Sequence, residues 1–311
     1  MTDVRIGKSR VYASDLGLGT NAVGGHNLFP NLNDETGKKV IRTAINNGIT
    51  LLDTAYAYGY GRSEELIGEV LQDPEFDRSR IIIATKAAHD PENNYAFNNS
   101  PQFLKQSVED ALKRLQTEYI DIFYIHFPDE ATPKNEAIAA LHELKEEGKI
   151  RAIGVSNFSL EQLKEANQEG YVDVVEEQFN LIHREHEKDL FPYLKENRIS
   201  FVPYFPLASG LLTGKYKKED RFDTSDRRSQ RPDFTGERFE KIVGKVDQLK
   251  PIAKNYDATV AQLILAWYMK HPQISVIIPG AKQPEQVEAN AKAVDIRLTT
   301  EDFDTIDHLF K

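Results

Sequence analysis

Short apolar segments alternate with longer amphipathic segments along most of the chain. The apolar segments are continuous runs of Val, Ile, Leu and Phe, a pattern typical of parallel strands that are covered on both faces. They predict eight strands, at residues 16–20, 50–55, 81–87, 120–126, 150–157, 174–180, 200–206 and 275–280.

The segments between these strands carry apolar residues at helical spacing. In the first of them, Val40, Ile41 and Ala44 fall on one face of a helix, and a later segment opens on Ser100-Pro101, which is a helix start signal. The pattern predicts helices over residues 34–48, 100–116, 135–149, 159–170, 185–197 and 259–272.

Eight strand-then-helix units in one chain fit a (β/α)8 TIM barrel, which typically takes about 250 residues plus insertions. A doubly wound open sheet is the alternative. The regular spacing favours the barrel, as do the polar residues that recur where strands end, because those ends meet on one rim of a barrel. Residues 4–15 predict an N-terminal β-hairpin. Residues 213–240 are charged and lack apolar periodicity, so they predict a long insertion between strand 7 and strand 8 of a single domain spanning 1–311.

Composition narrows the function classes. The chain has 39 Lys and Arg against 49 Asp and Glu, a formal charge of −10, which opposes attraction to nucleic acid or anionic lipid. It has no Cys, which removes disulfides, thiolate nucleophiles and Cys-ligated metals. No stretch of about 18 apolar residues and no apolar leader occur. We therefore expect a cytoplasmic protein, a monomer or weak oligomer, that acts on a small molecule.

Four side chains near successive strand ends form an acid–base set: Asp53, Tyr58, Lys86 and His126. Singly, each has a structural explanation, such as a turn residue or a rim salt bridge. Together they are more specific. A Tyr hydroxyl is a poor proton donor at neutral pH unless a nearby ammonium favours the phenolate, and a buried Lys keeps its charge when it is paired with a carboxylate. The His adds a hydrogen-bond donor or a second acid. The set suits protonation of a carbonyl oxygen, and it supplies no nucleophile and no reductant.

These residues stand in segments that resemble the aldo-keto reductase superfamily, in the same order and over nearly the whole chain. The branch most resembled is that of the bacterial IolS-like (family 11) NADP-dependent reductases of inositol catabolism, which is related to the potassium-channel β subunits. The segments that carry the resemblance are residues 48–68, 81–87, 119–129, 150–163, 176–182, 202–216 and 276–290.

The resemblance implies roles for the acid–base set. Tyr58 is then the proton donor, Lys86 and Asp53 tune it, and His126 orients the carbonyl. The implied reductant is NADPH, bound along the C-terminal rim of the barrel, with no metal. The implied cofactor residues are Gly19, Thr20, Asn21, Asp53, Ser156, Asn157, Gln178, Tyr204, Phe205, Pro206, Leu207, Gly210, Leu211, Gly280, Lys282, Gln286 and Asn290.

Within that set the resemblance assigns Ser156, Asn157 and Gln178 to the nicotinamide carboxamide, Tyr204 to stacking on the ring, and residues 206–211 to the pyrophosphate. Lys282 is assigned to the 2′-phosphate of the adenosine, and Gln286 and Asn290 to the adenine.

Two positions depart from the pattern of the relatives. Phe205 replaces a common Ser, so no hydroxyl contact is expected there. Gln286 replaces a common Arg, which predicts weaker phosphate affinity while NADPH remains the expected cofactor. Arg227 and Arg228 in the insertion are candidates to close over the pyrophosphate, and a solvated charged loop is the alternative.

Three hypotheses of function follow. The first is an NADPH-dependent reductase of aldehydes or ketones, sugar- or inositol-derived compounds among them. The second is a protein that binds NADPH tightly as a sensor and turns over slowly. The third is a metal-assisted barrel hydrolase using His126, His183 and His186, which the lack of a His-x-His at the first strand argues against.

Overall fold

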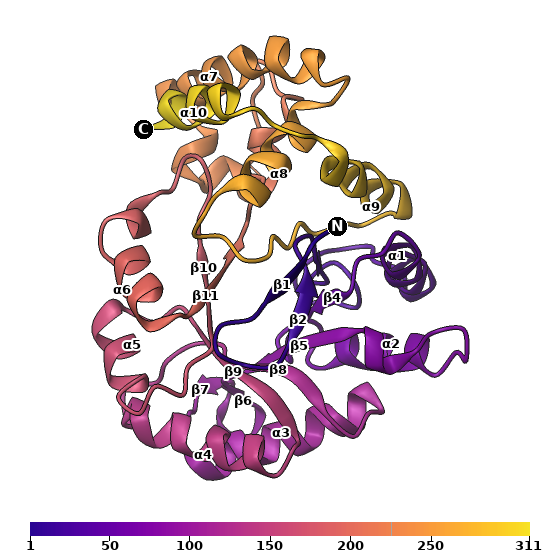
Figure 1. Ribbon diagram of the computed structural model, residues 1–311. Helices are drawn as coiled ribbons and strands as arrows, with labels where there is room; N and C mark the ends of the chain where they lie inside the picture. The colour runs from indigo at the N-terminus through magenta and orange to yellow at the C-terminus, as the bar shows by residue number, and fades with distance from the viewer. Residues whose placement is uncertain (225) are drawn as a thin grey trace.

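The computed structural model describes residues 1–224 and 226–311, with Arg227 described by its backbone alone. Its centre is a curled sheet of seven parallel strands (Figure 1). Neighbouring strands in this sheet follow the order β11-β10-β9-β8-β5-β4-β3, so the sheet runs in chain order from one edge to the other. The strands are β3 (Leu18–Gly19), β4 (Leu51–Asp53), β5 (Ile82–Ala87), β8 (Ile120–Ile125), β9 (Ile150–Ser156), β10 (Val174–Gln178) and β11 (Ser200–Tyr204).

The two edges of this sheet are joined by residues 275–280. The amide of Ser275 donates to the carbonyl of Phe201 at 2.9 Å, and on the other side the amide of Gly17 donates to Ile277 at 2.7 Å. Parallel bridges also pair Leu16 with Ile277 and Gly19 with Gly280. The arrangement is consistent with a (β/α)8 barrel, and the expected eighth strand is present as isolated bridges rather than a regular ladder.

Helices lie around the outside of the sheet (Figure 1). Several begin where the sequence supplies a cap: Ser100 accepts from the amide of Phe103, and Ser159 and Thr259 each form a capping box with a Gln three residues on. The helices are α1 (Asp34–Asn46), α2 (Arg62–Leu71), α3 (Pro101–Leu115), α4 (Lys134–Glu146), α5 (Leu160–Ala166), α6 (Leu190–Asn197), α7 (Gly236–Asn255), α8 (Val260–Lys270), α9 (Pro284–Ala291) and α10 (Thr300–Phe310).

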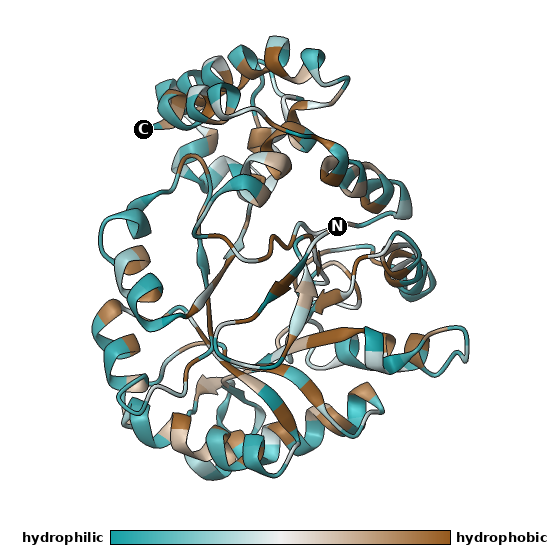
Figure 2. Ribbon diagram, viewed as in Figure 1, coloured by the Kyte–Doolittle hydropathy of each residue, from teal (hydrophilic) through white to brown (hydrophobic). Residues whose placement is uncertain are grey.

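Two apolar clusters hold the fold together. The larger fills the layer between sheet and helices, and accordingly the helix ribbons alternate between brown and teal in Figure 2. The smaller lies inside the curled sheet, where inward side chains such as Leu51, Ile122 and Val174 meet Val276 and Ile278 of the joining segment. Because one cluster lies on each face, the strands are apolar on both sides, as their continuous pattern predicts.

The predicted N-terminal hairpin is confirmed. Strands β1 (Asp3–Arg5) and β2 (Tyr12–Ser14) pair antiparallel, and the hairpin crosses the centre of the barrel in the view of Figure 1. Its residues Ile6, Val11 and Ala13 belong to the inner cluster. The amide of Gly7 donates to the Ser200 hydroxyl at 2.8 Å, which anchors the turn to the start of β11. The hairpin therefore covers the end of the barrel at which the strands begin.

Three further regions of the structure differ from the sequence prediction. Residues 185–197 form a 3-10 turn, η3 (Glu185–Glu187), followed by α6, rather than one helix. Among the described residues between β11 and α7 there are only the short turns η4 (Ala208–Thr213), η5 (Arg227–Gln230) and η6 (Pro232–Phe234), and the irregular stretch ends at α7 rather than at residue 240. A short antiparallel pair, β6 (His89–Asp90) with β7 (Ala96–Phe97), also decorates the loop after β5.

Within the described residues, no helix combines the length and apolar character needed to cross a membrane.

Candidate active site

The four acid–base residues lie at, or shortly after, the carboxyl ends of three adjacent strands of the sheet. Asp53 is the last residue of β4, Lys86 is the second-last residue of β5, and His126 directly follows β8. Tyr58 lies in the loop between β4 and α2. The carboxyl ends of neighbouring parallel strands share one rim, and this brings the four side chains together at the rim opposite the hairpin.

Lys86 is the centre of the group. Its ammonium is buried and donates to Asp53 Oδ1 at 2.5 Å and to the carbonyl of Thr54 at 2.9 Å. Burial by itself lowers the pKa of Lys86, but the negative charges beside it outweigh burial and raise that pKa above its ordinary value. The residue is therefore a fixed positive charge at neutral pH, as the sequence predicts for a lysine paired with a carboxylate.

Tyr58 lies against this charge, with Lys86 Nζ 5.7 Å from the centre of its ring. Burial raises the pKa of the Tyr58 phenol most, and Lys86 lowers it in the expected direction, while Asp53 adds a further upward contribution. The net shift is upward, contrary to the expectation of a phenol made more acidic. In this state Tyr58 keeps its proton at neutral pH, which is the form that a proton donor must have.

His126 completes the group as a neutral ring. Its imidazole lies 6.3 Å from the ring of Tyr58, nearly perpendicular to it, and stacks on Phe127 at 4.6 Å. Burial, then the charge of Lys86 and that of His89, lower the pKa of His126 well below its ordinary value. Of the two roles that the sequence left open, hydrogen-bond donor and second acid, the neutral imidazole favours the donor.

Sequence reasoning missed one member of the group, Glu176. It lies in the middle of β10, and its Oε2 is 3.2 Å from Lys86 Nζ. Burial, followed by the charge of Asp53, raises the pKa of Glu176 well above its ordinary value. The signal was present in the sequence as two consecutive Glu residues within an apolar strand, one of which must point inward.

The predicted carboxamide residues lie along the rim next to this group. The Tyr204 hydroxyl donates to Asn157 Oδ1 at 2.8 Å, and the Asn157 amide donates to the carbonyl of His126 at 2.9 Å and to the Ser156 hydroxyl at 3.0 Å. Gln178 pairs in register with Tyr204 across β10 and β11. Asn157 has a left-handed backbone (φ 61°), which these bonds hold in place. The side chains of Ser156, Asn157 and Tyr204 are linked by hydrogen bonds beside His126, and Gln178 stands next to Tyr204 on the neighbouring strand.

The predicted pyrophosphate segment, residues 206–211, forms a sharply folded loop together with Phe205. Phe205, Ala208 and Ser209 all have positive φ, although none is Gly, and Gly210 has φ 90°. Such conformations cost roughly 1–3 kcal/mol each, so the surroundings must enforce them. Tyr268 does so in part by donating its hydroxyl to the carbonyl of Pro206 at 2.8 Å. Phe205 is left partly exposed, while Leu211 is buried beneath the loop and Leu207 packs against the outer cluster.

The insertion contacts this loop through a residue that the sequence did not single out. Arg231 donates to the Ser209 hydroxyl at 2.7 Å and lies over the ring of Phe205 at 5.8 Å. Arg228 instead binds Asp226 and lies 4.7 Å from the ring of Phe222. Arg228 is therefore occupied within the insertion, and the side chain of Arg227 lies outside the described part of the structure.

The first rim segment lies on the other side of Asp53. The Thr20 hydroxyl donates to the carbonyl of Asp53 at 2.8 Å, and Gly19 bridges to Gly280. A Cβ at Gly19 would lie 2.9 Å from the carbonyl of Ile278, so only Gly fits this close approach of the two segments. Asn21 follows at the surface, half-buried, with its Oδ1 facing Gly280.

The predicted adenosine residues lie on and before α9. Lys282 is exposed, and its Nζ lies 4.4 Å from the centre of the Phe29 ring. Gln286 accepts from the backbone amides of Lys282 at 2.7 Å and Gln283 at 3.2 Å, so its carbonyl caps the start of α9. Asn290 is half-buried near the end of the helix. Of the three, Lys282 has the side chain that is free of hydrogen bonds to described residues and charged for a phosphate.

The donor set fits a nicotinamide dinucleotide. The Ser156–Asn157–Gln178 edge offers hydroxyl and amide groups for a carboxamide, and the half-buried ring of Tyr204 lies next to them. The folded 205–210 backbone and the Lys282 ammonium follow further along the same rim. Hydroxyl, amide, backbone and cationic donors in this order match the polar groups of such a cofactor from one end to the other.

The histidines of the hydrolase hypothesis do not converge. His183 Nε2 bonds to Asp233 Oδ2 at 2.7 Å, and His186 is partly buried on η3, whereas His126 belongs to the group around Lys86. In the described part of the chain, no three His, Asp or Glu side chains are arranged to hold a metal ion.

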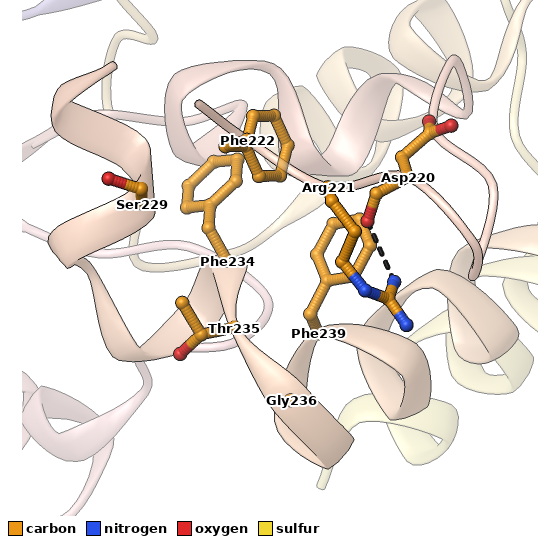
Figure 3. Close-up of a pocket in the computed structure, with 8 residues that line it drawn as sticks. All are labelled: Asp220, Arg221, Phe222, Ser229, Phe234, Thr235, Gly236 and Phe239. Atoms are coloured by element: carbon orange, nitrogen blue, oxygen red, sulfur yellow. Dashed lines mark hydrogen bonds between the residues drawn. The ribbon is translucent and has the colours of Figure 1, made fainter. Parts of the chain in front are cut away.

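A separate small cavity of about 150 Å³ lies within the insertion (Figure 3). It is lined by the rings of Phe222, Phe234 and Phe239 together with Asp220 and Arg221, and it includes none of the acid–base residues. We regard it as part of the packing of the insertion against α7, because the three rings contact one another at 5.3–6.4 Å.

Comparison with known proteins identifies the family. Residues 15–311 match the model of the aldo/keto reductase family, and the chain belongs to that family. It is 39% identical to the aldo-keto reductase YhdN of Bacillus subtilis over 96% of this chain and 90% of that protein. It is 32% identical to the NADH-specific methylglyoxal reductase of Escherichia coli over 97% and 96% of the two chains.

Among solved structures, the glycerol dehydrogenase AKR11B4 of Gluconobacter oxydans aligns over 99% of this chain and 94% of its own, with a TM-score of 0.89 and 33% identity. The resemblance to family 11 reductases is thus confirmed. The chain has the fold of enzymes that use nicotinamide cofactors to interconvert carbonyl compounds and alcohols, and family membership replaces the hydrolase hypothesis.

Proposed function

We propose that the protein is an NADPH-dependent reductase of aldehydes and ketones in which Tyr58 is the proton donor. The observation that supports this most is the buried group at the ends of β4, β5 and β8, where a protonated phenol and a neutral imidazole lie beside a lysine locked to a carboxylate. Such a group is preorganised to receive the negative charge that develops on a carbonyl oxygen.

The bound cofactor supplies the hydride that adds to the carbonyl carbon. The residues of the chain do the rest. The neutral ring of His126 donates a hydrogen bond that orients the carbonyl oxygen, and Tyr58 transfers its phenolic proton to that oxygen as charge develops on it. Lys86, held by Asp53, then stabilises the phenolate that Tyr58 becomes.

The preference for NADPH over NADH rests on Lys282, an exposed ammonium at the far end of the rim. The Escherichia coli relative is described as NADH-specific, so the family includes both preferences. Gln286 contributes no charge, and its carbonyl is occupied by the backbone at the start of α9. We therefore assign the discrimination to a single cation rather than a pair.

The substrate class that we propose is small carbonyl compounds, sugar- and inositol-derived aldehydes and ketoses among them. Two of the similar proteins are described as a methylglyoxal reductase and a glycerol dehydrogenase, whose names imply small oxygenated compounds. A panel of such compounds with NADPH and NADH, compared by kcat/KM in both directions, tests this assignment.

The role of Tyr58 is tested by Tyr58→Phe, with Tyr60→Phe as the matched control in the same loop. Tyr60 is half-exposed, and the centre of its ring lies 4.5 Å from that of Tyr95. Loss of a positioned acid lowers kcat by roughly 10²–10⁴-fold, measured as the consumption of NADPH with a reactive aldehyde, while cofactor binding measured by fluorescence is kept. If Tyr58→Phe retains a tenth or more of the wild-type rate, another group donates the proton.

A further inference from the structure

Glu176 is placed by strand geometry against the charged group. Consecutive side chains of a strand point to opposite faces, so Glu176 points into the barrel while Glu177 points outward. The outward Glu177 accepts from the amide of Phe158 at 2.8 Å and steadies the loop after β9. The inward Glu176 lies 3.2 Å from Lys86 Nζ, which also meets Asp53 at 2.5 Å. One ammonium therefore faces two carboxyl groups.

The charges of this cluster do not balance if both carboxyl groups are ionised. Asp53, Lys86 and Glu176 are each at most 3% exposed. The other titratable groups that face them are Tyr58 from the loop after β4, Tyr124 from β8, His126 directly after β8, and Tyr204 from β11. Burial raises the pKa of each of the three phenols and lowers that of His126, so all four are neutral near pH 7. Within the described residues, no second cation reaches the cluster.

One oxygen of each carboxyl group also lacks a well-placed donor. Asp53 Oδ2 is buried and accepts no hydrogen bond from any described residue, and Glu176 Oε2 has only its 3.2 Å ion pair with Lys86. The two carboxyl groups lie within hydrogen-bonding reach of each other. Two ionised carboxylates cannot satisfy each other, because both only accept. A proton on one of them supplies the missing donor and removes the excess charge at the same time.

We propose that Glu176 is a positioning residue of the reductase, whose carboxyl shares one proton with Asp53 and so holds Asp53 and Lys86 in the geometry that supports Tyr58. The inference rests on the proposed function for its kinetic consequence, but the shared proton itself does not depend on it. The proton resides chiefly on Glu176, because Asp53 has the shorter contact with the ammonium. The role proposed for Glu176 is exerted through Asp53 and Lys86 rather than directly on the carbonyl or the cofactor.

The shared proton is tested by infrared spectroscopy of the cofactor-free protein at about pH 8, where Glu177, whose pKa burial raises to about 7, is mostly ionised. The spectrum of wild type minus Glu176→Gln is expected to contain the C=O band of a protonated carboxyl group. The spectrum of wild type minus Glu177→Gln, the neighbouring control, is expected to lack it. Absence of the band from the Glu176 difference spectrum overturns the proposal, whether or not the protein reduces any carbonyl compound.

The positioning role is tested by two substitutions. Gln keeps an N–H that donates to Asp53, whereas Leu fills similar space without a donor. We expect Glu176→Leu to lower kcat at least tenfold with the KM of the carbonyl substrate unchanged, and Glu176→Gln to restore most of that loss. Equal loss of kcat in both variants, or a loss that appears mainly in KM, overturns the positioning role. If Glu176→Leu does not fold, Glu176→Met, which also lacks a donor, takes its place in the same comparison with Glu176→Gln.

Discussion

Replacing Lys86 by Met removes the positive charge from the centre of the site. The Met side chain fills much of the same space, so the main change is electrostatic. Asp53 and Glu176 lose the ammonium at 2.5 Å and 3.2 Å, and the carbonyl of Thr54 loses its donor at 2.9 Å. Breaking a buried ion pair by removing one partner costs about 3–5 kcal/mol. We expect a loss of this size in the free energy of unfolding near pH 8.

The loss depends on pH because Asp53, once it has lost the ammonium, becomes neutral in acid, whereas Glu176 already carries a proton in both proteins. Lys86 opposes the burial that raises the pKa of Asp53, so removing Lys86 raises that pKa further above its value in the unfolded chain, about 4. The stabilisation that such a group gives the folded protein is complete below the pKa of the group in the unfolded chain. It is lost as the pH rises through the pKa of the group in the folded protein. Each pH unit in this window changes stability by about 1.4 kcal/mol per group. The variant should therefore recover about 2 kcal/mol or more between pH 8 and pH 5, relative to wild type.

Urea unfolding of both proteins at the two pH values measures this difference. Lys134→Met is the matched control, since Lys134 is also buried but bonds chiefly to the backbone carbonyls of Asp129 and Thr132, each at 2.6 Å. The control should lose stability with little dependence on pH. If Lys86→Met loses the same amount at both values, the loss comes from packing, and the electrostatic account of the cluster is wrong.

Two further predictions concern the cofactor rim. Lys282→Met should raise the KM for NADPH about tenfold and leave the KM for NADH unchanged, because one charge-assisted bond to phosphate is lost. An equal change for both cofactors in steady-state kinetics would show that Lys282 does not discriminate between NADPH and NADH. Arg231→Ala should speed cofactor release about threefold to tenfold in stopped-flow measurements, because the bond from the insertion to Ser209 is lost. Arg228→Ala is its control, since Arg228 is paired with Asp226, and the same acceleration in both variants would refute the specific role of Arg231.

Much of the fold could be predicted because the apolar pattern of each strand recurs at regular spacing along the chain and matches the strands of the structure. Residues such as 81–87 and 120–126 are apolar on both faces, and they became β5 and β8 within one residue at each end. The segment 275–280 has the same apolar pattern but forms only bridges. Pro279 lacks an amide hydrogen, so this segment cannot complete a regular ladder. The apolar pattern thus predicts where a segment lies more reliably than how it is bonded.

The acid–base group could be predicted from the strand ends on which Asp53, Lys86 and His126 stand, but its electrostatics could not. The direction of the Tyr58 pKa depends on whether burial or Lys86 dominates, and burial is a property of the folded chain. Glu176 was missed for a similar reason. Which of two adjacent Glu residues faces inward is fixed by the register of β10 against β9 and β11, which the sequence does not specify.

The N-terminal hairpin limits which parts of the enzyme can evolve toward a new substrate. Ile6, Val11 and Ala13 close one end of the barrel. Small molecules therefore reach and leave the site around Lys86 only through the opposite end. Selection for a new substrate then acts on loops such as 88–100 and 205–235, while the end covered by the hairpin is selected for stability alone. Exchanging those loops between relatives should change the substrate without disturbing the packing of the hairpin.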